Sequence, residues 1–155
     1  MANTVTVKHN AELGHRLYPL GGKCSSLHGH SWYIEVTVQG ELQDGVPIIV
    51  DFGSLKKDLR TFVDENLDHG LALGYGDPLL ASIIDDGGKV FIFGNEKWDG
   101  PHENKLEEYA EDLKWPTVEA MSILIARVMK SFGHNVVRVH VSETAVNAAT
   151  WTEDN

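Results

Sequence analysis

Residues 24–32 read Cys24-Ser25-Ser26-Leu27-His28-Gly29-His30-Ser31-Trp32, and a regular alternation begins inside this stretch at His28. Six residues share one face of the alternation: His28, His30, Trp32, Ile34, Val36 and Val38. Such alternation is typical of a β-strand with one buried face, and residues two apart then project from the same side. The stretch therefore predicts a core strand that begins with two histidines side by side.

Further strands are predicted on either side of this stretch. The β-rich residues Thr4–Val7 begin a strand that we expect to run through His15, and Pro and paired Gly in Tyr18–Lys23 indicate a loop. Residues 40–45 are turn-like and Val46–Val50 is short and apolar. This pattern predicts a hairpin between Ser31–Gln39 and Val46–Val50.

Two amphipathic helices are expected, each with an apolar stripe at helical spacing. The first spans Ser54–Asn66, with the stripe Leu55, Leu59, Phe62 and Val63. The second begins at Pro116 and ends at Gly133, with the stripe Met121, Leu124, Ile125, Val128 and Met129. A short helix is expected at 77–84, and strands at 89–93, 136–143 and 147–152. The pattern predicts an α+β fold, with antiparallel strands and helices packed on one face.

The composition restricts the partners. The 155 residues carry a formal net charge of −10, which argues against a nucleic-acid or an anionic-membrane partner. A single cysteine excludes an internal disulfide, no membrane span or signal peptide is visible, and we expect a reducing cytoplasm. We expect one domain over residues 1–155. Residues 94–115 hold seven acidic residues and three lysines, and we interpret them as an acidic surface excursion without a core face.

His28 and His30 are candidate metal ligands because they project from one face of the strand. His15, on the neighbouring strand, is the nearest candidate for a third ligand. Three imidazoles and one open position are typical of catalytic zinc. The alternative is a pair of polar residues at a sheet edge, and the spacing alone leaves that interpretation open. Cys24 lies between Lys23 and these histidines, where a thiolate would be stabilised, although a lone cysteine is more often a small buried apolar residue.

Three further residues are candidates for the chemistry. Asp68 can orient the imidazole of His69 as a proton carrier, or the pair can simply end a helix. Glu143 can accept two N–H bonds from a heterocycle, or it can be an ordinary residue at a strand end. The remaining histidines, His9, His102, His134 and His140, lack a comparable setting.

Six short segments, taken in order, resemble the 6-pyruvoyl-tetrahydropterin synthase family and its 6-carboxy-5,6,7,8-tetrahydropterin synthase (QueD) branch. They are Ala11–Leu17, Lys23–Ser31, Val50–Lys56, Leu67–His69, Pro116–Glu119 and Val141–Thr144. The three residues between Cys24 and His28 resemble the carboxy-forming branch, because the pyruvoyl-forming branch usually has a longer gap. Two features depart from the family: Ala120 stands where Asn is common, and residues 94–115 are an insertion.

The resemblance implies a role for each matching position. It implies that His15, His28 and His30 bind Zn²⁺, that Cys24 is the catalytic thiol and that Asp68 and His69 are an acid–base pair. Glu143 would bind the pterin ring as the substrate-binding carboxylate. Lys8, Arg16 and Lys23 are basic residues that would offer positive charge to a triphosphate.

The resemblance also implies a fold and a reaction. The fold is the tunnelling fold (T-fold), whose subunits join their sheets into a barrel, typically as a homohexamer of two trimers. The substrate would be 7,8-dihydroneopterin triphosphate, converted to 6-carboxytetrahydropterin, acetaldehyde and triphosphate in the biosynthesis of the queuosine precursor. The alternatives are the pyruvoyl-forming reaction on the same substrate and a non-catalytic T-fold protein that binds pterin or zinc.

Overall fold

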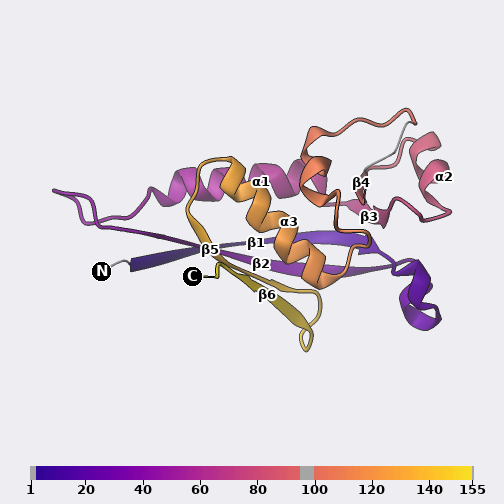
Figure 1. Ribbon diagram of the computed structural model, residues 1–155, viewed down its shortest axis with the longest axis horizontal. Coiled ribbons are helices and arrows are strands. Elements are labelled where there is room, and N and C mark those ends of the chain that lie inside the picture. The colour runs from indigo at the N-terminus through magenta and orange to yellow at the C-terminus, as the bar shows by residue number, and fades with distance from the viewer. Residues whose placement is uncertain (1–2, 95–99, 155) are drawn as a thin grey trace.

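The computed structural model describes residues 3–94 and 100–154, and within them one six-stranded sheet of order β4-β3-β1-β2-β5-β6 (Figure 1). The strands are β1 (Asn3–His15), β2 (His28–Gly40), β3 (Gly70–Gly74), β4 (Val90–Phe93), β5 (Val136–Ser142) and β6 (Ala148–Thr152). The α-helices are α1 (Phe52–Asn66), α2 (Leu80–Asp85) and α3 (Val118–Ser131). Short 3-10 turns are η1 (Tyr18–Leu20), η2 (Gly22–Ser25) and η3 (Lys105–Ala110).

The long antiparallel ribbon of β1 and β2 forms the centre of the sheet. The two strands pair from Asn3 opposite Gly40 to His15 opposite His28, without a shift in register. Trp32, Ile34, Val36 and Val38 of β2 are buried on one face, as the alternation predicted. Ser31 and Tyr33 lie on the opposite, exposed face. The predicted strands that begin at Thr4 and His28 are thus confirmed.

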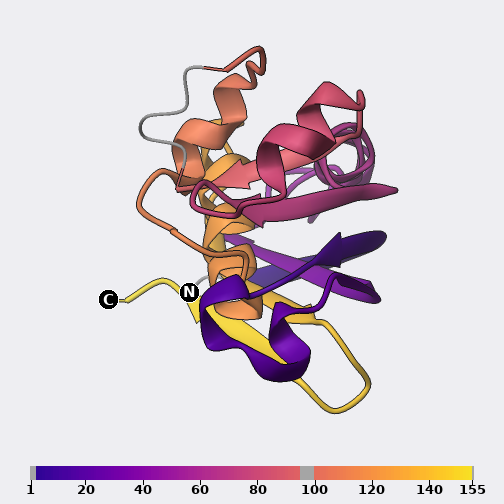
Figure 2. The ribbon, with the colours of Figure 1, turned by 90° about the vertical axis from the view of Figure 1, so that its right-hand side faces the viewer.

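Both predicted long helices cover the same side of the sheet, with α1 on β1 and α3 on β5 and β6 (Figures 1 and 2). All nine residues of the two predicted apolar stripes are buried. Helix α1 begins at Phe52, two residues earlier than predicted, because the Asp51 carboxylate accepts the N–H of Gly53 (3.1 Å) and caps the helix. The α+β class is confirmed. Among the residues described, no helix is both long and apolar enough to cross a membrane.

The sheet is mixed rather than wholly antiparallel, which corrects the sequence-based expectation. Strand β3 was not predicted, and it runs parallel to both β1 and β4. It has only five residues, two of them glycines, so it carries little strand signal. Helix α2 lies between β3 and β4, and a helical crossover of this kind returns the chain in the same direction. Strand β3 runs opposite to β2, the strand before α1, and therefore parallel to β1.

The predicted hairpin between Ser31–Gln39 and Val46–Val50 is wrong. Residues 41–51 form no strand and lie at one end of the β1–β2 ribbon (Figure 1). Strand β2 already pairs with β1 on one side and with β5 on the other, so its central residues have no free edge. Val46 and Ile48 are exposed and pair with nothing in the sheet.

The acidic stretch 94–115 contributes to the core, contrary to expectation. Its residues 95–99 lie outside the described part of the chain, as do residues 1, 2 and 155 of the predicted domain. Within η3, Glu107 and Ala110 are buried, while Leu106 and Tyr109 pack against the main core. The Glu107 carboxylate accepts the N–H of Ile92 in β4 (2.6 Å) and pairs with His102 Nε2 (2.8 Å). This buried carboxylate attaches the stretch to the sheet.

Replacing Glu107 by Ala is expected to lower the free energy of unfolding by about 3 kcal/mol, because it leaves buried polar partners without their acceptor. Glu108→Ala is the matched control, since Glu108 is exposed on the same turn, and it should change stability by less than about 0.5 kcal/mol. Urea unfolding of both variants measures the difference. Equal stabilities would contradict the anchoring contact.

Candidate metal centre and active site

Strand pairing brings three histidines together at one end of the ribbon. His15 in β1 lies directly opposite His28 in β2, and His30 lies two residues further along the same face. Ligand nitrogens of the three side chains lie within 4.8 Å of one another. The ring centroid of His15 lies 4.7 Å from that of His28 and 5.2 Å from that of His30. The three predicted metal ligands therefore form one cluster.

Backbone carbonyls orient two of these rings. Nδ1 of His15 is 2.8 Å from the carbonyl oxygen of Pro116, just before α3, and Nδ1 of His28 is 2.6 Å from that of Ser26. A carbonyl only accepts, so each Nδ1 carries the hydrogen and donates it. Each Nε2 is then left with a free lone pair, which is the form of imidazole that binds a metal.

Burial favours the neutral form of His15 and His30. His15 is 2% exposed, and its Nε2 has no hydrogen-bond partner among the described residues. Burial lowers the pKa of His15 to about 4; the bond to Pro116 opposes this shift, and the neighbouring His28 and His30 add to it. Burial also lowers the pKa of His30, although Glu143 partly offsets the effect. The buried, unpaired nitrogen of His15, next to two further imidazoles, fits a bound divalent ion of the kind that prefers imidazole.

Trp32 forms the base of the cluster and was not singled out from the sequence. It is fully buried, its indole N–H donates to the carbonyl oxygen of Leu13 (3.0 Å), and its ring centroid lies 4.9 Å from that of His15. Its position two residues after His30, on the same face, was the available signal. The contact with the carbonyl of Pro116 left no signal in the sequence, because Pro116 lies 101 residues from His15.

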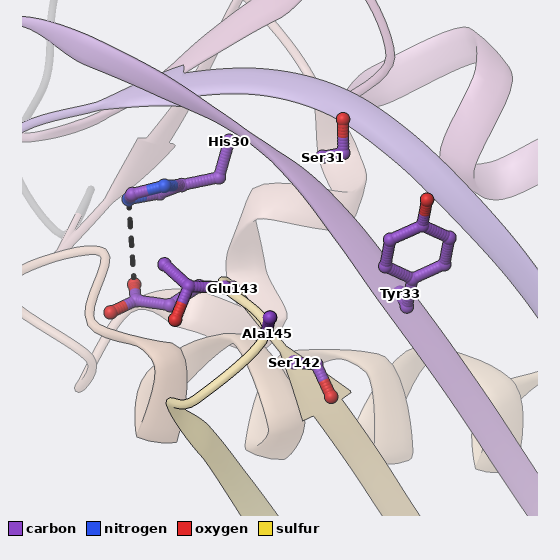
Figure 3. A pocket seen from close by; sticks show the side chains of 7 residues that line it. His30, Ser31, Tyr33, Ser142, Glu143 and Ala145 are labelled. Carbon is purple, nitrogen blue, oxygen red and sulfur yellow. Dashed lines mark ion pairs between the residues drawn. The ribbon is translucent and has the colours of Figure 1, made fainter.

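Glu143 lies beside the cluster, just beyond the end of β5. Its Oε2 is 3.8 Å from Nε2 of His15 and 3.9 Å from Nε2 of His30, and its side chain is 20% exposed. In Figure 3 its carboxylate points toward His30 and away from Tyr33. The carboxylate and His30 line a pocket of about 480 Å³ together with Ser31, Tyr33 and Ser142. A polar ligand in this pocket would contact Glu143 and His30 at once.

Cys24 lies in η2, within the connection that joins His15 to His28. Its side chain is exposed and its thiol is free. The carbonyl oxygen of Cys24 accepts the N–H of Leu17 (2.6 Å), so the connection folds back on itself. The turn that carries Cys24 therefore lies at the end of the ribbon where β1 ends at His15 and β2 begins at His28.

Asp68 and His69 form the expected pair, but His69 is outside the histidine cluster. Oδ2 of Asp68 lies 2.8 Å from Nδ1 of His69, and Oδ1 accepts the N–H of Glu12 (2.8 Å). The Glu12 N–H, with the bond to His69 adding to it, lowers the pKa of Asp68. The His69 side chain is 81% exposed, and its φ of 59° puts it in the left-handed region. A single chain thus presents this pair to solvent.

Lys89 holds the turn that carries Asp68 and His69. Its ammonium donates to the carbonyl oxygens of Asp64 and Asp68, both at 2.6 Å, where α1 ends. A cation at this end of a helix satisfies the free carbonyls and complements the helix dipole. The pair is therefore presented on a turn whose backbone is fixed.

Comparisons with known proteins agree on one family. The profile described as 6-pyruvoyl tetrahydropterin synthase matches residues 4–154. A probable 6-carboxy-5,6,7,8-tetrahydropterin synthase of Halobacterium salinarum is 34% identical over 115 residues, which cover 73% of each chain. The 6-carboxy-5,6,7,8-tetrahydropterin synthase of Rickettsia bellii is 37% identical over 86 residues, or 54% of this chain. The chain spans 62% of the length of that relative.

Solved structures share the fold at lower identity. A protein of Wolinella succinogenes superimposes with a TM-score of 0.70 at 24% identity, over 99% of both chains. A 6-pyruvoyl tetrahydropterin synthase of Caenorhabditis elegans superimposes with a TM-score of 0.66 at 19% identity, over 99% of this chain and 97% of its own. These likenesses establish the T-fold of the single chain.

Replacing His28 by Ala is expected to abolish tight metal binding, because two imidazoles rarely hold a zinc ion where three are needed. Metal analysis after dialysis measures the bound ion. His140→Ala is the control, since His140 lies on β5 outside the cluster. A full complement of metal in His28→Ala would contradict the proposed ligand set.

The metal-free protein is expected to lose stability between pH 6.5 and pH 4 through His15. The unfolded chain takes up a proton on this imidazole near pH 6.5, whereas the folded chain does so only near pH 4. The contribution of His15 to the free energy of unfolding is therefore fully present above pH 6.5. It falls by about 3 kcal/mol in total as the pH drops to 4.

His15→Gln removes this titration while keeping a polar side chain. Urea unfolding of both proteins between pH 4 and pH 7 isolates the histidine, because all other groups titrate in both. If the free energies of unfolding of the two proteins changed with pH in parallel, His15 would not be held neutral by burial.

Proposed function

The chain belongs to the 6-pyruvoyl tetrahydropterin synthase family, and on that premise we propose that it is a 6-carboxy-5,6,7,8-tetrahydropterin synthase. The substrate is 7,8-dihydroneopterin triphosphate. With one water consumed, the products are 6-carboxytetrahydropterin, acetaldehyde and triphosphate, and the first of these leads to the queuosine precursor. The observation that carries the proposal is the cluster of three imidazoles beside the Glu143 pocket.

The ion in this proposal is Zn²⁺, held by His15, His28 and His30. Three nitrogen donors with an open position are the usual ligand set of catalytic zinc, which would polarise the hydroxyls of the substrate side chain. The Nδ1 bonds to Pro116 and Ser26 support this assignment, because they turn both Nε2 atoms toward one point. The low pKa of His15 keeps that ligand available at neutral pH.

The remaining residues bind the substrate and move protons. Glu143 accepts two N–H bonds from the edge of the pterin ring, and its carboxylate already borders a pocket of suitable size. Cys24 is the thiol that exchanges a proton with the substrate side chain. Asp68 orients His69 as the partner acid or base, which the 2.8 Å contact between them supports.

An oligomer completes the site in this proposal. His69 is exposed and lies outside the histidine cluster of its own chain, so in this proposal it acts on a substrate bound at another subunit. Joining the sheets of several subunits into a barrel would bring the Asp68–His69 pair of one subunit to the cluster of the next. We propose a homohexamer of two trimers, in the cytoplasm, with small-molecule substrate and no nucleic-acid or membrane partner.

Product analysis tests the reaction. Purified zinc-loaded protein is incubated with 7,8-dihydroneopterin triphosphate, and the products are separated and identified. Acetaldehyde and a carboxypterin in equal amounts support the proposal. A pyruvoyl-pterin would assign the chain to the pyruvoyl-forming reaction, and the absence of turnover would make it a pterin- or zinc-binding protein.

Cys24→Ala is expected to keep zinc and lose turnover by at least about a hundredfold, because the thiol moves protons without binding the metal. Ser25→Ala is the matched control on the same turn, since its hydroxyl donates to the carbonyl oxygen of Gly22 within that turn. Zinc content and turnover are measured on both. Loss of zinc from Cys24→Ala would make the thiol a ligand and refute its assigned part.

A further inference from the structure

Arg16, the residue after His15, is bound by the carboxylate of Asp77. Its Nε donates to Oδ2 of Asp77 (2.8 Å) and its Nη2 to Oδ1 (2.5 Å). The Asp77 side chain is fully buried, and Oδ1 also accepts the N–H of Leu79 (2.8 Å) at the turn that leads into α2. The carboxylate is thus fixed by its own turn and offers Arg16 a rigid, two-pronged acceptor.

This ion pair removes Arg16 from the residues available to a substrate anion. Burial acts to raise the pKa of Asp77, but the bonds from Arg16 and Leu79 outweigh it, so the pKa lies below its usual value. The same contact raises the pKa of Arg16. Both groups therefore stay charged and neutralise each other, which corrects the expectation that Arg16 offers free positive charge to a triphosphate.

The pair also reaches the turn that carries Cys24. The third guanidinium nitrogen of Arg16, Nη1, donates to the carbonyl oxygen of Ser25 (3.4 Å). Next along the chain, the N–H of Leu17 donates to the carbonyl oxygen of Cys24 (2.6 Å). Two successive carbonyls at the thiol are therefore held by the two residues that follow the metal ligand His15.

Hydrogen bonds, rather than packing, hold this connection in place. Neither η1 nor η2 contains a buried residue, and Cys24 itself is exposed. The ring of Tyr18 lies against the guanidinium of Arg16 (4.9 Å), so part of η1 also rests on the pair. Without the anchor at Asp77, few contacts would define where the thiol lies.

We propose that Arg16 and Asp77 are positioning residues that hold the Cys24 thiol at a fixed place relative to the three-histidine cluster. The pair links the end of β1, the entry to α2 and the cysteine turn. The catalytic consequence rests on the proposed function, in which Cys24 acts on the substrate. The positional consequence stands on the contacts alone.

Asp77→Asn tests the pair because it removes the negative charge with little change in shape. We expect full zinc content, an unchanged KM, a kcat about ten- to a hundredfold lower, and hydrogen exchange of the Leu17 amide at least about tenfold faster. Asp112→Asn is the matched control, since Asp112 binds Arg127 in the same two-pronged way on the surface. It should leave all four quantities unchanged.

Arg16→Lys is the second variant, and it decides the question if Asp77→Asn does not fold. Lysine keeps the charge beside Asp77 but lacks the fork that also reaches Ser25. For Arg16→Lys, both the kcat and the hydrogen-exchange rate of the Leu17 amide should lie between the values of the wild type and those of Arg16→Met. In the wild type, the Leu17 amide should be protected from hydrogen exchange. Exchange at the rate of an unfolded chain would overturn the proposal.

The outcomes separate this proposal from the proposed function. If the wild type is active and the folded, zinc-loaded variants match its kcat and its Leu17 exchange, the positioning pair is refuted while the function stands. If the wild type is inactive but Leu17 exchange rises in the variants, the pair still positions the turn and only the function fails.

Discussion

The antiparallel register of β1 and β2 is the constraint on which the histidine cluster depends. The two strands pair over their full length, and this pairing places His15 opposite His28 and next to His30. A slip of one residue would turn every side chain of one strand to the other face. Trp32, Ile34, Val36 and Val38 oppose such a slip, because it would expose them all. The apolar core thereby sets the geometry of a polar site at its end.

The chemistry of the cluster is local and differs from the charge of the whole chain. The protein carries a net charge of −10, yet the cluster consists of three imidazoles, two of which are directed by carbonyl oxygens. The carboxylate of Glu143 lies beside the cluster, 3.8 Å from Nε2 of His15 and 3.9 Å from Nε2 of His30. Burial and backbone hydrogen bonds, rather than long-range charge, prepare these nitrogens to bind a metal.

The errors of sequence-based prediction have identifiable causes. Val46–Val50 has the apolar character of a strand, but both edges of β2 were already taken by β1 and β5. Strand β3 is too short and too rich in glycine to show a period, and its direction is visible only in its pairing with β1 and β4. In η3, a buried glutamate resembles a surface residue until Ile92 and His102 are seen beside it.

The sequence by itself determined the α+β class, the two central strands, both long helices and the candidate ligands, because alternation and helical spacing are local properties of the chain. It also placed His28 and His30 on one face, since that follows from a spacing of two. Only the tertiary structure decided that His15 completes the cluster, that the carbonyl of Pro116 directs its ring and that Asp77 neutralises Arg16. Those partners are 61 and 101 residues apart in the chain, and only folding brings them together.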